Sequence, residues 1–112
     1  MRLNKQKMDD ALLELGFPER LKGTEVLRRA AEQYAQRPGQ SLTKELYPAL
    51  AEAFNAEPTQ IERNMRHAIE RAWRDGNQEY QRRLFGWTYS AQMGRPTVGE
   101  TIARIVRFCS ED

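Results

Sequence analysis

The segment from Ser41 to Gly76 constrains the fold of this chain more than any other part of the sequence. Its apolar residues recur at helical spacing and predict a short helical turn at 41–46, a helix at 47–54 and a longer helix at 58–75. Pro48 and Pro58 fit the first turns of the two later helices, because the amide hydrogen that proline lacks has no intrahelical acceptor there. A turn of only three residues, 55–57, separates these helices, which predicts a helix-turn-helix motif at about 47–76.

The expected helix at 58–75 has one apolar side and one charged side. At about 100° per residue, its apolar residues form a stripe that should face the core: Ile61, Met65, Ala68, Ile69, Ala72 and Trp73. The opposite side carries a polar set: Arg63, His67, Glu70 and Arg74. Arg66 lies on the flank of this set, and Glu62 lies nearer the core boundary. Arginine therefore dominates the charged side near the start of the helix, where a helix inserted into a DNA groove contacts bases.

Arg63 and Arg66 are the candidates for reading DNA bases. An arginine side chain can donate two hydrogen bonds to guanine, and a carboxylate can accept one from the cytosine amino group, which makes Glu62 a weaker candidate. The alternative is an ordinary solvated face held by the ion pairs Glu62–Arg66 and Glu70–Arg74. Periodicity alone does not decide between these two interpretations.

Other polar side chains near these helices are candidates for contacts with the DNA backbone. The start of the 41–46 turn brings together two hydroxyls, a lysine and free backbone amides, which suit a phosphate group. For Ser41, capping the turn is the simpler role. His67 is the only histidine and has no partner at metal-ligand spacing, so we expect a structural or DNA-backbone role and neither a metal nor a cofactor. The backbone candidates are Ser41, Thr43, Lys44, His67, Arg71 and Arg74.

The rest of the sequence predicts an all-α bundle of about six or seven helices in a single domain, 1–112. The additional helices are expected at about 4–15, 24–36, 77–85 and 97–109, with Asn4, Asn77 and Thr97 as N-caps. Leu12, Leu13 and Leu15 are expected in the core. A loop is expected at 87–96, and the aromatic residues around it should fill the core beneath the long helix and anchor the loop: Trp73, Phe85, Trp87 and Tyr89. A basic arm formed by Arg2, Lys5 and Lys7 is less expected than a frayed polar terminus.

Composition limits the remaining possibilities. Eighteen Lys and Arg against sixteen Asp and Glu leave a net charge of only +2, so any DNA binding must depend on where the positive residues lie. No apolar run approaches the roughly 18–20 residues of a membrane span. One cysteine allows no intramolecular disulfide and fits the cytoplasm, where we expect the protein. No nucleophile–base or metal constellation indicates an enzyme, and no small-molecule substrate is expected.

Several runs of the sequence resemble one known family, the C-terminal effector domains of the stage-zero sporulation protein A response regulators. The resemblance rests on LTKELYPALAEAFN, IERNMRHAIERAW and LFGWT, with LLELGFPERLKG before them and RPTVGETIARIV after them in the same order. It extends from about Leu12 to Val106. It implies an all-helical, sequence-specific domain of a transcription regulator that binds duplex DNA, with the long helix in the major groove.

The resemblance also implies roles for particular residues. In the family, an E-R-x-x-R stretch of the long helix contacts bases, and Glu62, Arg63 and Arg66 occupy those positions here. Family domains bind tandem sites head to tail with a contribution from the last helix, 97–109 in this chain. In the family a receiver domain precedes the effector domain, and we expect none within these 112 residues. A protein-interaction module that dimerises with or antagonises a full-length regulator remains the alternative, and the presence of both arginines argues against it.

Overall fold

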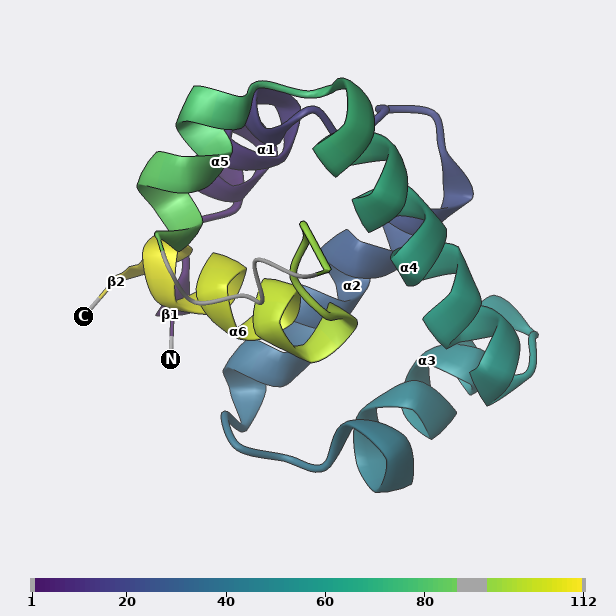
Figure 1. Cartoon of the computed structure of the whole chain (residues 1–112). Helices are drawn as coiled ribbons and strands as arrows, with labels where there is room; N and C mark the ends of the chain where they lie inside the picture. The colour runs from purple at the N-terminus through teal and green to yellow at the C-terminus, as the bar shows by residue number, and fades with distance from the viewer. Residues whose placement is uncertain (1, 87–92, 112) are drawn as a thin grey trace.

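The computed structural model describes residues 2–86 and 93–111. The described residues form six α-helices, one short helical turn and a pair of two-residue strands (Figure 1). In chain order these elements are β1 (Arg2–Leu3), α1 (Lys5–Leu15), α2 (Lys22–Gln36), η1 (Leu42–Leu46), α3 (Tyr47–Phe54), α4 (Pro58–Asp75), α5 (Gln78–Phe85), α6 (Val98–Cys109) and β2 (Ser110–Glu111). The prediction of an all-α fold is confirmed, and α3 and α4 follow one another as the sequence predicts.

The three expected N-caps are all present. The Asn4 side chain accepts a hydrogen bond from the Lys7 amide at 2.9 Å, and the Asn77 side chain accepts one from the Tyr80 amide at 3.0 Å. Thr97 caps α6 reciprocally with Glu100, which is described below. Helix α2 begins two residues earlier than expected, at Lys22, and its N-terminus has no side-chain cap.

Replacing Thr97 with alanine is expected to lower the free energy of unfolding by about 0.5–2 kcal/mol. The Thr97 hydroxyl accepts from the Glu100 amide at 3.1 Å, while the Glu100 carboxylate accepts from the Thr97 amide at 2.8 Å. Alanine removes the first of these bonds and leaves an amide at the helix end without its acceptor. Urea unfolding of the Thr97→Ala and Thr97→Ser variants measures the effect. Serine should retain most of the stability, and equal losses in the two variants would contradict the capping role.

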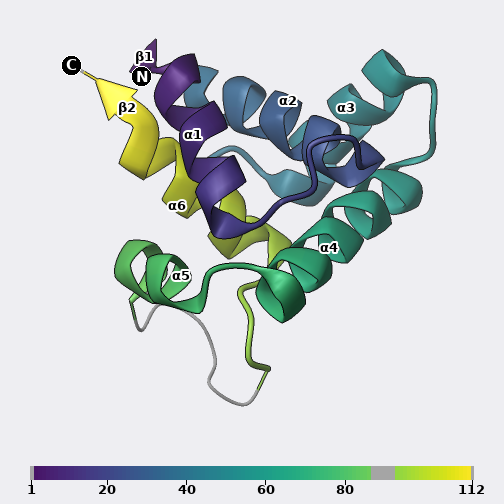
Figure 2. The same ribbon diagram turned by 90° about the horizontal axis from the view of Figure 1, so that it is seen from above.

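Helix α2 packs most extensively against α4 and next against α6. In Figure 2 it runs behind α1 towards α3. The six apolar residues predicted for the inner side of α4 are all buried, which confirms the orientation of that helix. Gly23 lets the first turn of α2 approach α4 closely, because a Cβ atom at this position would lie 1.9 Å from the Asn64 carbonyl oxygen. A Cβ atom on Gly76 would lie 2.3 Å from the Leu15 carbonyl oxygen, so glycine is also required where α4 ends against α1.

Two details differ from the sequence expectations. Leu13 is 65% exposed, so it does not belong to the core with Leu12 and Leu15. The N-terminus is neither a free basic arm nor a frayed end, because β1 pairs antiparallel with β2 and Lys7 lies over the Phe108 ring at 4.6 Å. Strands of two residues are too short to show a periodic pattern, which is why the sequence did not predict them. Trp87 and Tyr89 lie outside the described residues.

Candidate nucleic-acid interface

The outer side of α4 presents a row of basic residues to solvent. Four arginines and the histidine of this helix are exposed, while Glu62 and Glu70 are intermediate in exposure. The exposed set is Arg63, Arg66, His67, Arg71 and Arg74. The apolar residues of α4 are anchored in the core, so this basic row keeps a fixed direction relative to the rest of the domain.

Four of the candidate residues line one shallow depression at the start of α4: Thr43, Glu62, Arg63 and Arg66. The depression has a volume of about 400 Å³ and is completed by Tyr47, Pro58 and Thr59. It therefore joins η1, α3 and the first turns of α4 into one continuous surface. Sequence reasoning missed Tyr47 and Thr59, although Thr59 lies in the first turn of the helix that it singled out.

The turn η1 is held in place by its own first residues. The Ser41 hydroxyl accepts from the Lys44 amide at 3.1 Å, which is the capping role considered for Ser41. The Ser41 amide donates to the Glu45 carboxylate at 3.0 Å, and Arg37 also pairs with that carboxylate. The Arg37 hydrogen bond is the main reason that the pKa of Glu45 lies below its usual value. These contacts leave the side chains of Thr43 and Lys44 exposed beside the depression.

Glu62 and Arg66 form an ion pair one helical turn apart, with 3.5 Å between Oε1 and Nη1. The Arg63 side chain makes no hydrogen bond or ion pair within residues 2–86 and 93–111, and its guanidinium is open to solvent. Burial, with a smaller effect of the Glu62 charge, raises the pKa of Tyr47 to about 12. The Tyr47 hydroxyl therefore remains protonated at physiological pH, and it lies in the same depression as Glu62, Arg63 and Arg66.

The second ion pair expected on α4, Glu70–Arg74, is absent, and both residues have other partners. Glu70 pairs with Arg95, from the segment before α6, at 3.1 Å. Arg74 pairs with the adjacent Asp75 at 3.1 Å. Sequence spacing could not indicate the Glu70–Arg95 contact, because the two residues are 25 positions apart and belong to different elements. An arginine thus accompanies each carboxylate on the outer side of α4, which limits the repulsion that a phosphate backbone would meet there.

Among the described residues, no group of three or more His, Cys, Asp or Glu side chains could hold a metal ion. None of the helices in the described ranges is both long and apolar enough to cross a membrane.

Comparison with known protein families gives a match over residues 8–108. The matching family is described as "Sporulation initiation factor Spo0A C terminal". The match spans every α-helix of the described structure apart from the ends of α1 and α6, and it includes η1, α3 and the whole of α4.

Proposed function

The chain belongs to the Spo0A C-terminal family, whose members are DNA-binding effector domains, and we propose that it binds duplex DNA sequence-specifically with α4 in the major groove. The observation that carries this proposal is the basic depression at the start of α4. There, Arg63 and Arg66 are exposed in the first turns of a helix whose opposite side is buried in the core. A helix held in this way presents its first turns to a groove without first having to fold or rotate.

In this proposal, Arg63 and Arg66 each donate to the O6 and N7 acceptors of a guanine. Glu62 accepts a hydrogen bond from the amino group of a cytosine, which that base presents in the major groove. Because Arg66 is paired with Glu62 at 3.5 Å in the free protein, the two side chains separate or share the same base pair on binding. Their pairing keeps both charged groups at the mouth of the depression before DNA arrives.

Contacts to the phosphate backbone are assigned to residues around this depression. Thr43 and Lys44 present a hydroxyl and an ammonium group from η1, and the Ser41 hydroxyl can still donate while its oxygen caps the turn. His67 and Arg71 lie further along the exposed side of α4. Arg74 is also assigned to phosphate, although its guanidinium must leave or share the Asp75 carboxylate. We further assign α6 to contact between two molecules bound head to tail on tandem sites.

Selection from a library of random-sequence duplexes tests this function. The proposal expects one motif to be enriched, and expects the protein to bind that selected duplex more tightly than a scrambled duplex of the same composition at physiological salt. Binding that shows no enriched motif and disappears as salt rises would be non-specific attraction to phosphate. That result would contradict sequence-specific binding and favour a domain of this fold used for protein contacts.

Replacing Lys44 or Arg71 with alanine is expected to weaken binding to selected and scrambled duplexes by similar factors. Each variant removes a charge that lies beside phosphate, so the slope of log K against log salt should fall by roughly one unit per lost contact. A salt series on both duplexes measures this slope. Glu52→Ala, a change at an exposed site on α3, serves as a control for substitution as such. A loss confined to the selected duplex would instead place Lys44 or Arg71 at the bases.

A further inference from the structure

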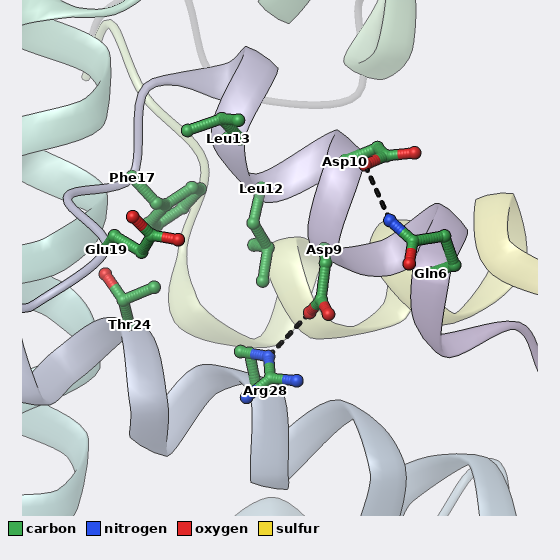
Figure 3. A pocket seen from close by; sticks show the side chains of 9 residues that line it. All are labelled: Gln6, Asp9, Asp10, Leu12, Leu13, Phe17, Glu19, Thr24 and Arg28. Atoms are coloured by element: carbon green, nitrogen blue, oxygen red, sulfur yellow. Dashed lines mark hydrogen bonds and ion pairs between the residues drawn. The ribbon is translucent and has the colours of Figure 1, made fainter.

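A second depression lies between α1 and the start of α2, and it shares no residue with the candidate interface. It has a volume of about 420 Å³ and is shown in Figure 3. Three carboxylates line it, those of Asp9, Asp10 and Glu19, against the single guanidinium of Arg28. Arg28 pairs with Asp9 at 2.7 Å, which leaves the charges of the other two carboxylates uncompensated among the lining residues. We call this surface the acidic cleft.

The two uncompensated carboxylates are open to solvent and lie apart from each other. Within residues 2–86 and 93–111, Asp10 accepts only a hydrogen bond from the neutral Gln6 side chain, at 3.0 Å, and Glu19 has no hydrogen bond or ion pair. Figure 3 shows Glu19 at one end of the acidic cleft and Asp10 at the other, with Leu12 and Leu13 between them. Two separate cations therefore complement this surface better than one.

Apolar side chains line the acidic cleft between its charged ends. Leu13 is 65% exposed, whereas Leu12 and Phe17 are 3% exposed. A lone exposed leucine is common on protein surfaces, but Leu13 belongs to a cleft that also holds two carboxylates open to solvent. An apolar group that enters the cleft between two cations would bury part of Leu13.

Thr24, in the first turn of α2, supplies an independent observation. It lines the acidic cleft and is 5% exposed, and its Oγ1 atom has no hydrogen-bond partner in the described part of the chain. In Figure 3 its side chain extends from α2 toward Glu19 and Phe17, with the hydroxyl oxygen on the side of Glu19. A buried hydroxyl is normally hydrogen-bonded, so this one points to a ligand that brings a carbonyl or an amide group into the cleft.

We propose that the acidic cleft binds a segment of a partner protein in which two arginines flank apolar residues. The arginines pair with Asp10 and Glu19, because a planar guanidinium matches a carboxylate through two parallel hydrogen bonds. The apolar residues lie on Leu13, and a backbone group of the segment completes the hydrogen bonding of Thr24. Carboxylates repel phosphate, so DNA is not the occupant, and the inference does not depend on the proposed function.

A capped tetrapeptide of two leucines flanked by two arginines tests this site. Amide chemical shifts of the whole chain are followed as the peptide is added in the absence of DNA. We expect saturable binding with a Kd below about 1 mM, with the largest changes in α1 and at the start of α2. Replacing both arginines of the peptide with glutamine, or both leucines with glycine, should weaken binding by about tenfold or more.

Variants of the protein separate the contacts. Asp10→Asn and Glu19→Gln should each weaken peptide binding by about 2–5-fold, with the two factors multiplying in the double variant. Thr24→Val removes the hydroxyl and should weaken peptide binding without lowering the urea midpoint, because a hydroxyl without an internal partner does not stabilise the free protein. Glu79→Gln on α5, at an exposed acidic site outside the cleft, is the matched control and should bind the peptide as the wild type does.

Several results would overturn the proposed site. Equal affinity for the arginine and glutamine peptides, or shift changes centred away from α1 and α2, would contradict it. Wild-type affinity in the Asp10→Asn and Glu19→Gln double variant, or in Thr24→Val, would do the same. If the peptide with glycines bound as tightly as the peptide with leucines, the cleft would be a site for small cations and not for a protein segment. Because DNA is absent from these titrations, none of these results bears on the proposed function.

Discussion

Replacing Trp73 with alanine is expected to lower the free energy of unfolding by about 3–5 kcal/mol. Trp73 is 8% exposed and lies on the core side of α4. Its ring contacts Phe85 of α5 edge-on, with 4.9 Å between centroids, and Phe17 after α1 in the same manner at 6.2 Å. A single side chain thus joins three segments of the chain. Alanine would leave a cavity at their junction and remove both aromatic contacts.

Urea unfolding followed by circular dichroism measures this effect. Trp73→Phe keeps an aromatic ring and should lose considerably less stability, while Arg71→Ala, on the exposed side of the same helix, should change stability by less than about 0.5 kcal/mol. A near-neutral Trp73→Ala variant would mean that α4 is rotated about its axis relative to the described structure. In that case the assignment of its outer side to DNA would fail as well.

Replacing Arg63 or Arg66 with alanine is expected to weaken binding to the selected duplex by about 1–3 kcal/mol, a factor of roughly 5–150. Each arginine can form two hydrogen bonds with one guanine, and alanine leaves the acceptors of that base without a protein partner. The preference at one base position should relax in each variant. Arg66→Ala also leaves the Glu62 carboxylate unpaired next to the DNA, so its loss should exceed that of Arg63→Ala.

Parallel titrations with selected and scrambled duplexes measure these losses. Arg82→Ala removes one exposed arginine from α5 and serves as the matched control, since it lowers the net charge equally. The control should reduce binding to both duplexes slightly and by similar factors. Equal losses on the two duplexes for Arg63→Ala and Arg66→Ala would show that these residues contact phosphate and do not read bases.

Local signals accounted for most of the helices. The caps Asn4, Asn77 and Thr97 act within three residues along the chain, so the sequence alone is sufficient to place them. The buried side of α4 was also predictable, because six apolar residues at helical spacing leave little choice of which side faces the core. The same periodicity placed Arg63 and Arg66 on the exposed surface.

Contacts between distant segments could not be predicted in this way. The exposure of Leu13, by contrast, has a local explanation, because the buried residues of α1 follow helical spacing (Met8, Ala11, Leu12 and Leu15) and Leu13 lies outside that stripe. The Glu70–Arg95 pair and the pairing of β1 with β2 join residues 25 or more positions apart. The cleft lined by Asp9, Asp10 and Arg28 likewise exists only because the start of α2 folds back beside α1. These features depend on tertiary packing, which leaves no periodic trace in a sequence.

The candidate site was predicted in part. Spacing identified the arginines of α4 and left Glu62 as a weaker candidate, which the resemblance to the Spo0A C-terminal family then promoted. The structure adds that Thr43 joins Glu62, Arg63 and Arg66 at one depression, a convergence of η1 with α4 that requires the fold.

Mapping of amide chemical shifts on adding a selected duplex tests the central claim most directly, because it identifies the surface that meets DNA. We expect the largest changes in residues 41–47, which span η1 with its N-cap and the start of α3, and in residues 58–67 of α4, with small changes along α1. The free and bound spectra of Arg66→Ala at saturating DNA would serve as a reference for local effects. Large changes confined to α1 and α2, with α4 unaffected, would contradict the account.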